Sequence, residues 1–301
     1  MNGGSAGPIR RGVIDRAMLL VAALALWSGP ALAGADPGLP ASWTEAVEPV
    51  ELFDDVYWVG TRGLGAFLFT SEAGHVLVDV GVPSGAPLVA QAISSLGVDL
   101  RDVRVLLNTQ AHFDHAGGLA ELKALTGARL LASEGDRYAL EHGVYEGWES
   151  RPLFDFPAVE LDGVVTHGQV IRVGDVSLTA HATPGHSPGC TSWSFTARRD
   201  GAEHRAMIFC SASVAANRLA PDPQYDGIVE DFRATFAYMR GVEVDVWLTP
   251  HAEQFGLWEK LGRRDQAQDP FVDPSERGRE MANFEADFEA ALARQLAAPK
   301  R

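Results

Sequence analysis

The sequence predicts an α/β fold in which two sheets pack face to face with helices outside. Two observations predict this class. Short apolar runs with strand character precede segments with helical spacing, and this order occurs in both halves of the chain. Histidine-bearing turns follow several of these runs, at the carboxyl ends of strands where α/β sheets present functional side chains.

The predicted elements of the first half lead to a polar turn at residues 108–118. The predicted strands are residues 56–59 and 66–70, which form a hairpin, and the buried runs 75–80, 103–107 and 128–131. Ser84 is expected to cap a helix, whose apolar positions are Leu88, Val89, Ala92, Ile93 and Leu96. A second helix is predicted from the spacing of Leu119, Leu122 and Leu125.

The second half repeats strands followed by a helix. The predicted strands are residues 170–173, 176–181, 191–196, 205–209 and 244–248, with a helix near residues 229–239. The final helix is amphipathic, and its apolar stripe consists of Met281, Phe284, Phe288 and Leu292. We expect this stripe to pack on the core rather than on a partner.

The N-terminal residues have the pattern of a secretory signal peptide. Arginines precede an apolar run at residues 17–27, and Ala31, Leu32 and Ala33 form a small-x-small cleavage site. The apolar run is too short for a stable membrane anchor. The sequence therefore predicts a signal peptide at residues 1–33 and a single domain at residues 34–301, exported to the periplasm.

The chain is strongly acidic. The leader carries Arg10, Arg11, Arg16 and Asp15, hence a charge of +2, so the −15 of the whole chain leaves −17 for residues 34–301. Such acidity argues against nucleic acid or an anionic membrane as a partner. We expect a monomer that acts on a small molecule.

Two cysteines, Cys190 and Cys210, flank the predicted hairpin of residues 191–209. Pairing about its turn sets one roughly opposite the other, and an oxidising compartment permits a disulfide between them. Two reduced, buried thiols fit the sequence equally well, because a cross-strand bridge needs particular geometry.

The most informative motif is Gln110-Ala111-His112-Phe113-Asp114-His115. In an extended segment, alternate residues point to the same side, so Gln110, His112 and Asp114 converge, while His115 opens the next helix and can point elsewhere. His186 and His251 each follow a predicted strand. Nitrogen and oxygen donors gathered in this way indicate a metal site.

This combination resembles the metallo-β-lactamase superfamily over residues 56–251. The resemblance implies an αββα sandwich of two mixed sheets with helices outside. It also implies that Gln110, His112 and His186 bind a first zinc ion, and that Asp114, His115 and His251 bind a second. Up to two ions share a hydroxide that attacks a carbonyl carbon, and Asp114 is the catalytic residue that orients it.

Gln110 departs from most members of the family, which have histidine at this position. An amide oxygen is a weaker zinc donor than imidazole, so we expect the Asp114, His115 and His251 site to fill first and to bind zinc more tightly. Some metallo-β-lactamases of the third subclass (class B, subgroup three) also carry glutamine here, and the sequence is most similar to that subclass.

The segment after residue 208 lacks another family feature. Relatives such as glyoxalase II and lactonases have a metal-bridging aspartate there, whereas this chain reads Phe209-Cys210-Ser211-Ala212-Ser213. Cys210 aligns with the cysteine ligand of another β-lactamase subclass, but the context of Gln110 does not fit that subclass. The third subclass fits best, and Ser211 and Ser213 are candidates to bind a substrate carboxylate; hydroxyls at strand ends more often satisfy local backbone groups.

Several other residues have two interpretations. Asp79 either orients a metal-binding histidine or caps a turn. The aromatic loop at residues 143–157 either covers the substrate or anchors itself to the core, and Trp43 either lines the cleft or packs. His181 is expected to be a structural, hydrogen-bonding histidine.

The leading functional hypothesis is an exported zinc β-lactamase that confers antibiotic resistance by hydrolysing penicillins, cephalosporins or carbapenems. One alternative is a lactonase or thioesterase of the same fold. A second alternative, from a different class, is a non-catalytic zinc-binding protein.

Overall fold

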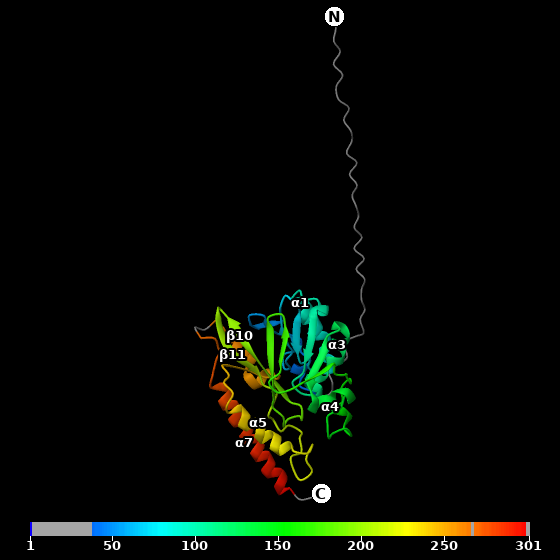
Figure 1. Ribbon diagram of the computed structural model, residues 1–301, viewed down its shortest axis with the longest axis vertical. Helices are drawn as coiled ribbons and strands as arrows, with labels where there is room; N and C mark the ends of the chain where they lie inside the picture. Colours follow the sequence, from blue (N-terminus) through cyan, green and yellow to red (C-terminus); the bar gives the residue numbers. More distant parts are fainter. Residues whose placement is uncertain (2–37, 266–267, 299–301) are drawn as a thin grey trace. The chain divides into compact units, whose positions relative to one another are not determined.

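The computed structural model describes residues 1, 38–265 and 268–298. The predicted signal peptide, apart from Met1, lies outside the described residues. Two sheets with helices on their outer faces make up the described part from residue 38 onward (Figure 1). No helix in the described ranges is long and apolar enough to cross a membrane.

The first sheet has seven strands in the order β1-β2-β3-β4-β5-β6-β7. Their bounds are β1 Val50–Phe53, β2 Val56–Trp58, β3 Phe67–Phe69, β4 His75–Val78, β5 Val103–Leu107, β6 Arg129–Ser133 and β7 Gly163–Val165. Strands β1 to β4 pair antiparallel and β4 to β7 pair parallel, so the sheet is mixed. The segments that follow β5 and β6 therefore leave the sheet at the same edge.

The second sheet has five strands in the order β12-β11-β10-β9-β8. Their bounds are β8 Val170–Val173, β9 Val176–Ala182, β10 Thr191–Arg199, β11 Ala202–Ile208 and β12 Val246–Leu248. Only the β11–β12 pair is parallel. The β10–β11 hairpin carries the Cys190–Cys210 disulfide, which settles the open alternative in favour of the bridge.

The core lies between the sheets and is rich in aromatic side chains. Trp58, Phe67, Trp193 and Phe69 are buried there, and the Phe69 and Phe195 rings lie 4.8 Å apart. Helices α1 (Ala86–Ser95), α3 (Leu119–Thr126) and α4 (Arg137–His142) pack on the first sheet. Helix α5 (Ile228–Met239) lies against α7 (Glu276–Ala297), which contacts β12 (Figure 1).

The remaining short helices are α2 (Phe113–Ala116) and α6 (Leu257–Gly262). Strands β1 and β7 and helices α4 and α6 were not predicted. The expectation that Ser84 caps α1 was wrong, because the residue belongs to a 3₁₀ turn, Pro83–Gly85, and the helix begins after Gly85. The predicted stripe of α7 does face the core: Met281, Phe288 and Leu292 are buried.

Candidate metal centre

The residues predicted to bind metal come from three turns. Gln110, His112, Asp114 and His115 follow β5, whereas His186 and His251 follow β9 and β12 of the other sheet. Bends at residues 109, 111 and 112, rather than a continued strand, carry the motif, and α2 begins at Phe113. The structure brings the histidines and Asp114 together as two adjoining clusters.

Asp114, His115 and His251 form the first of these clusters. The Asp114 Oδ2 atom lies 3.4 Å from His115 Nε2 and 3.4 Å from His251 Nε2. One ligand atom from each residue lies within 4.8 Å of the other two. Two imidazoles and a carboxylate that converge in this way are consistent with a zinc site. We call this cluster the aspartate subsite.

His112 and His186 form the second cluster, in which His112 Nδ1 lies 3.1 Å from His186 Nε2. The other nitrogen of His186, Nδ1, lies 2.6 Å from the Ser213 carbonyl oxygen and donates a hydrogen bond to it. A neutral imidazole that donates from Nδ1 has a free lone pair on Nε2, which is the form that binds metal.

Gln110 lies in the same turn, and its side chain is buried. Neither its amide oxygen nor its amide nitrogen has a hydrogen-bond partner among the described residues. Buried amide groups are normally paired, so the unpaired Gln110 amide is free to bind a ligand. We call Gln110, His112 and His186 the glutamine subsite.

The charges of the aspartate subsite are strongly coupled. Burial opposes ionisation of Asp114, but His115 and His251 hold the pKa of this carboxyl well below its usual value. Burial likewise opposes protonation of His115, and the carboxylates of Asp114 and Asp79 raise its pKa to about 10. In the glutamine subsite, by contrast, burial lowers the pKa of His186 to about 4 and that of His112 well below its usual value.

Asp79 lies behind the aspartate subsite, where its hydrogen bonds support the turn-capping interpretation, whereas its orientation of a metal-binding histidine stays a prediction. Its Oδ2 atom is 3.5 Å from His115 Nδ1. The same carboxylate accepts hydrogen bonds from Asn108 Nδ2 at 2.9 Å and from the Thr109 backbone N–H at 2.7 Å. It therefore holds the start of the motif turn and also faces a predicted ligand.

Sequence reasoning missed two further residues near the glutamine subsite. Asp136 is buried and accepts hydrogen bonds from the turns that carry His112 and His186. Asn217 donates from Nδ2 to the His186 carbonyl oxygen at 2.8 Å. The one available signal for Asp136 was its place after β6, at the edge where the motif turn also lies.

The aromatic loop at residues 143–157 is anchored beside the centre. The Tyr145 ring stacks on His112 with 4.0 Å between centroids, and its hydroxyl donates to Asn217 Oδ1 at 2.8 Å. The centroid of the Phe154 ring lies 5.5 Å from that of Tyr145 and 5.9 Å from that of Phe113. The ring centroids of Trp43 and His251 lie 5.6 Å apart, so aromatic rings flank both subsites.

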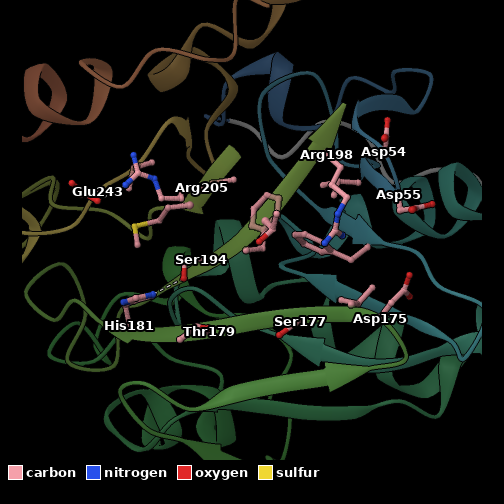
Figure 2. Close-up of a pocket in the computed structure, with 18 of the residues that line it drawn as sticks. Asp54, Asp55, Asp175, Ser177, Thr179, His181, Ser194, Arg198, Arg205 and Glu243 are labelled. Carbon is pink, nitrogen blue, oxygen red and sulfur yellow. Dashed lines mark hydrogen bonds and ion pairs between the residues drawn. The ribbon is translucent and has the colours of Figure 1, made fainter. Parts of the chain in front are cut away.

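A groove of about 440 Å³ runs elsewhere, across β9, β10 and β11, and none of the predicted ligands lines it (Figure 2). His181 lies in this groove, with Nε2 2.7 Å from Ser194 Oγ and Nδ1 2.6 Å from Tyr238 Oη. Both ring nitrogens are thus used in hydrogen bonds, which confirms the structural role predicted for this histidine.

Comparisons with known proteins agree with this architecture. Residues 66–200 match the sequence model of the metallo-β-lactamase superfamily. BJP-1, a subclass B3 metallo-β-lactamase of Bradyrhizobium japonicum, is 42% identical with a TM-score of 0.83, over 85% of this chain and 98% of that one. The FEZ-1 metallo-β-lactamase from Legionella gormanii is 28% identical with a TM-score of 0.81, over 86% of this chain and 100% of its own.

Curated relatives match a shorter stretch. A hydroxyacylglutathione hydrolase of Bradyrhizobium sp. (strain ORS 278) is 28% identical over 131 residues, which is 44% of this chain and 43% of that protein. The chain thus spans less than half the length of the first of these relatives. The long, 42% identical alignment with BJP-1 is decisive: this chain belongs to the metallo-β-lactamase superfamily, and its αββα fold is confirmed.

Proposed function

We propose that this chain is a zinc-dependent β-lactamase of the third subclass, which opens the four-membered amide ring of penicillins, cephalosporins or carbapenems. The observation that carries the proposal is the pair of adjoining donor clusters, in a chain that aligns with 98% of a subclass B3 enzyme. The segment after β11 supports the same subclass. Residues 209–213 contain only apolar side chains, a cysteine and serines, and so lack the bridging aspartate expected of glyoxalase II and lactonases.

The donor atoms of the centre fit zinc. The aspartate subsite offers two imidazoles and one carboxylate, and the glutamine subsite offers two imidazoles beside an unpaired buried amide. Three protein ligands at each subsite would leave a coordination position open for water or substrate, as catalytic zinc sites do. Gln110, His112 and His186 would hold one ion, and Asp114, His115 and His251 the other.

Zinc held in this way polarises a substrate carbonyl and lowers the pKa of water toward neutrality. The chain's own residues prepare the site for that chemistry. Asp114 stays ionised between two imidazoles, and an ionised carboxylate is able to accept a hydrogen bond from an attacking water and so to orient it. Cys190 and Cys210 are joined to each other and supply no nucleophile.

The surroundings of the centre suit a small substrate with apolar edges. Trp43, Phe113 and Phe154 present aromatic surface beside the subsites, and such surface excludes water from a reacting amide. Ser211 Oγ donates to Ser213 Oγ at 3.2 Å and accepts from the Ser213 backbone N–H at 3.1 Å, so the Ser211 hydroxyl is used within its own segment. Their predicted contact with a substrate carboxylate remains a prediction.

The test is hydrolysis of a chromogenic cephalosporin and of a carbapenem by residues 34–301, with and without a metal chelator. We expect zinc-dependent turnover that is abolished in Asp114→Ala. Asp102→Ala is the matched control, because the Asp102 side chain is half exposed and forms an ion pair with Arg104, away from the predicted ligands. Absence of turnover in zinc-loaded protein with two bound ions would contradict the β-lactamase proposal.

A second candidate is a hydrolase of thioesters or lactones, which is favoured by the similarity to hydroxyacylglutathione hydrolases. The same zinc-loaded protein should be assayed with a glutathione thioester and with a lactone. Turnover of these substrates without turnover of β-lactams would establish this alternative. Two bound zinc ions with no turnover of any of these substrates would leave a non-catalytic zinc-binding protein.

We also propose that the protein is exported to the periplasm as a monomer after cleavage at Ala33. The Cys190–Cys210 disulfide supports export, because such bridges persist in oxidising compartments. N-terminal sequencing of the protein recovered from a periplasmic fraction tests the cleavage site. Recovery of the uncleaved chain from the cytoplasm alone would contradict this proposal.

A further inference from the structure

The glutamine subsite is assembled across the two sheets. Gln110 and His112 follow β5 of the first sheet, whereas His186 follows β9 of the second. A metal ion held there needs these two turns at a fixed separation. An amide ligand adds little binding energy of its own, so the separation has to be set by other contacts.

Asp136 makes such contacts from a third position, the turn after β6. Its Oδ2 atom accepts hydrogen bonds from the Ala111 backbone N–H at 2.8 Å and from Ser187 Oγ at 3.2 Å. Its Oδ1 atom accepts one from the Gly189 backbone N–H at 2.9 Å. Ala111 lies between two predicted ligands of the subsite, and Ser187 directly follows the third.

The packing around this carboxylate leaves little freedom. Asp136 is 2% exposed. A Cβ added to Gly189 would lie 2.4 Å from the Asp136 backbone nitrogen and 2.5 Å from its Cγ, so only glycine permits this approach. A Cβ on Gly135 would lie 2.6 Å from the Pro188 carbonyl oxygen. The turns after β6 and β9 are therefore in direct backbone contact.

Asp79 provides the contrast. It faces His115 of the aspartate subsite and binds Asn108 and Thr109, which precede the motif. None of the three groups that donate to Asp136 belongs to, or adjoins, Asp114, His115 or His251. Asp79 therefore faces a residue of the aspartate subsite, which Asp136 does not.

We propose that Asp136 is a positioning residue for the glutamine subsite, which holds the Gln110–His112 turn and the His186 turn together so that an amide and two imidazoles can bind one metal ion. This inference rests on the proposed two-zinc centre. Asp136 touches neither substrate nor metal in this account; it acts through the backbone of its neighbours.

The experiment is a zinc titration of the metal-free full-length protein with Asp136→Asn and, as the matched variant, Asp79→Asn. Asparagine keeps the shape of aspartate but places an N–H group opposite a donor. We expect Asp136→Asn to weaken the ion of the glutamine subsite roughly 10- to 100-fold, as is typical for residues behind metal ligands, with the other ion unchanged. Asp79→Asn should weaken the ion of the aspartate subsite, because Asp79 faces His115.

Cobalt in place of zinc identifies which ion is lost, because Gln110→Ala and His251→Ala supply reference absorption spectra with one subsite impaired. Equal weakening of both ions in Asp136→Asn would show a merely structural role and overturn the proposal, as would unchanged affinities.

If Asp136→Asn does not fold, the same titration with Ser187→Ala tests the proposal. Selective weakening of the glutamine subsite in that variant supports the proposal, and unchanged affinity overturns it. A wild-type protein that binds fewer than two ions would instead refute the two-zinc centre itself.

Discussion

At the scale of single residues, Tyr145 links the aromatic loop to the metal centre in two ways. Its ring stacks on His112, and its hydroxyl donates to Asn217, which in turn donates to the His186 carbonyl. Tyr145 thus contacts His112 directly and is linked to His186 through the side-chain amide of Asn217.

Two variants of Tyr145 separate these contacts. Tyr145→Phe keeps the ring and leaves the buried Asn217 oxygen without a donor, which costs about 1–3 kcal/mol of unfolding free energy. Tyr145→Ala also removes the ring and should cost about 3–5 kcal/mol, the usual range for a buried aromatic residue. Urea unfolding of the metal-free protein measures both. A phenylalanine variant as stable as the wild type would contradict the hydrogen-bond role.

His181 makes the stability depend on pH. Burial, followed by the nearby His167, lowers the pKa of His181 below its usual value, and its two ring nitrogens are engaged by Tyr238 and Ser194. The unfolded chain therefore binds a proton at a higher pH than the folded protein, so stability falls as the pH falls through about 6.5. We expect His181→Asn to lose part of this dependence between pH 7 and pH 5, measured as the melting temperature against pH. An unchanged dependence of the melting temperature on pH in His181→Asn would contradict this role of His181.

The candidate metal ligands could be selected from the sequence because they follow a local pattern, whereas the residues that support them could not. Alternation within a single turn was enough to select Gln110, His112 and Asp114. Asp136 binds residues that lie 25 and 53 positions away in the sequence, and no local spacing signals such a contact. The sequence around it indicates only the end of the strand predicted at residues 128–131.

At the scale of elements, the C-terminal helix α7 is held by one aromatic cluster. Phe288 is fully buried. Its ring centroid lies 4.9 Å from that of Phe232 and 5.6 Å from that of Phe236, both in α5. Phe284 lies one turn earlier and is only partly buried, 6.1 Å from Phe209.

Phe288→Ala should therefore lower the unfolding free energy by about 3–5 kcal/mol. Phe284→Ala is the control of the same chemistry and should cost less, because part of its surface is already exposed. Denaturant unfolding of both variants tests this difference. Equal losses would contradict the view that α7 docks through Phe288.

Most strands were predicted because they contain runs of buried apolar residues, such as β3. The missed strands lie at one sheet's edges, where this signal fades. Strand β1 has two buried residues, and β7 has three residues and begins with a glycine. Edge pairing depends on a neighbouring strand rather than on the local sequence. Helix α4 is also short, and it ends at Gly143, which has a φ of 67°.

At the scale of the whole molecule, the Cys190–Cys210 disulfide closes a loop of 20 residues around the β10–β11 hairpin. Closing a loop of this size removes entropy from the unfolded chain worth about 3 kcal/mol. The double variant Cys190→Ala/Cys210→Ala should lose stability of about this size while keeping both zinc ions. Loss of zinc binding at unchanged stability would show that the bridge serves the centre instead.

The most direct test of the central claim is anomalous scattering at the zinc edge from crystals grown at limiting and at saturating zinc. At limiting zinc we expect one peak, between Asp114 Oδ2, His115 Nε2 and His251 Nε2, because the amide of Gln110 makes the other subsite weaker. At saturating zinc a second peak should lie beside Gln110, His112 Nδ1 and His186 Nε2. Equal occupancy of both positions at limiting zinc would contradict the unequal subsites, and a peak away from these residues would contradict the centre as a whole.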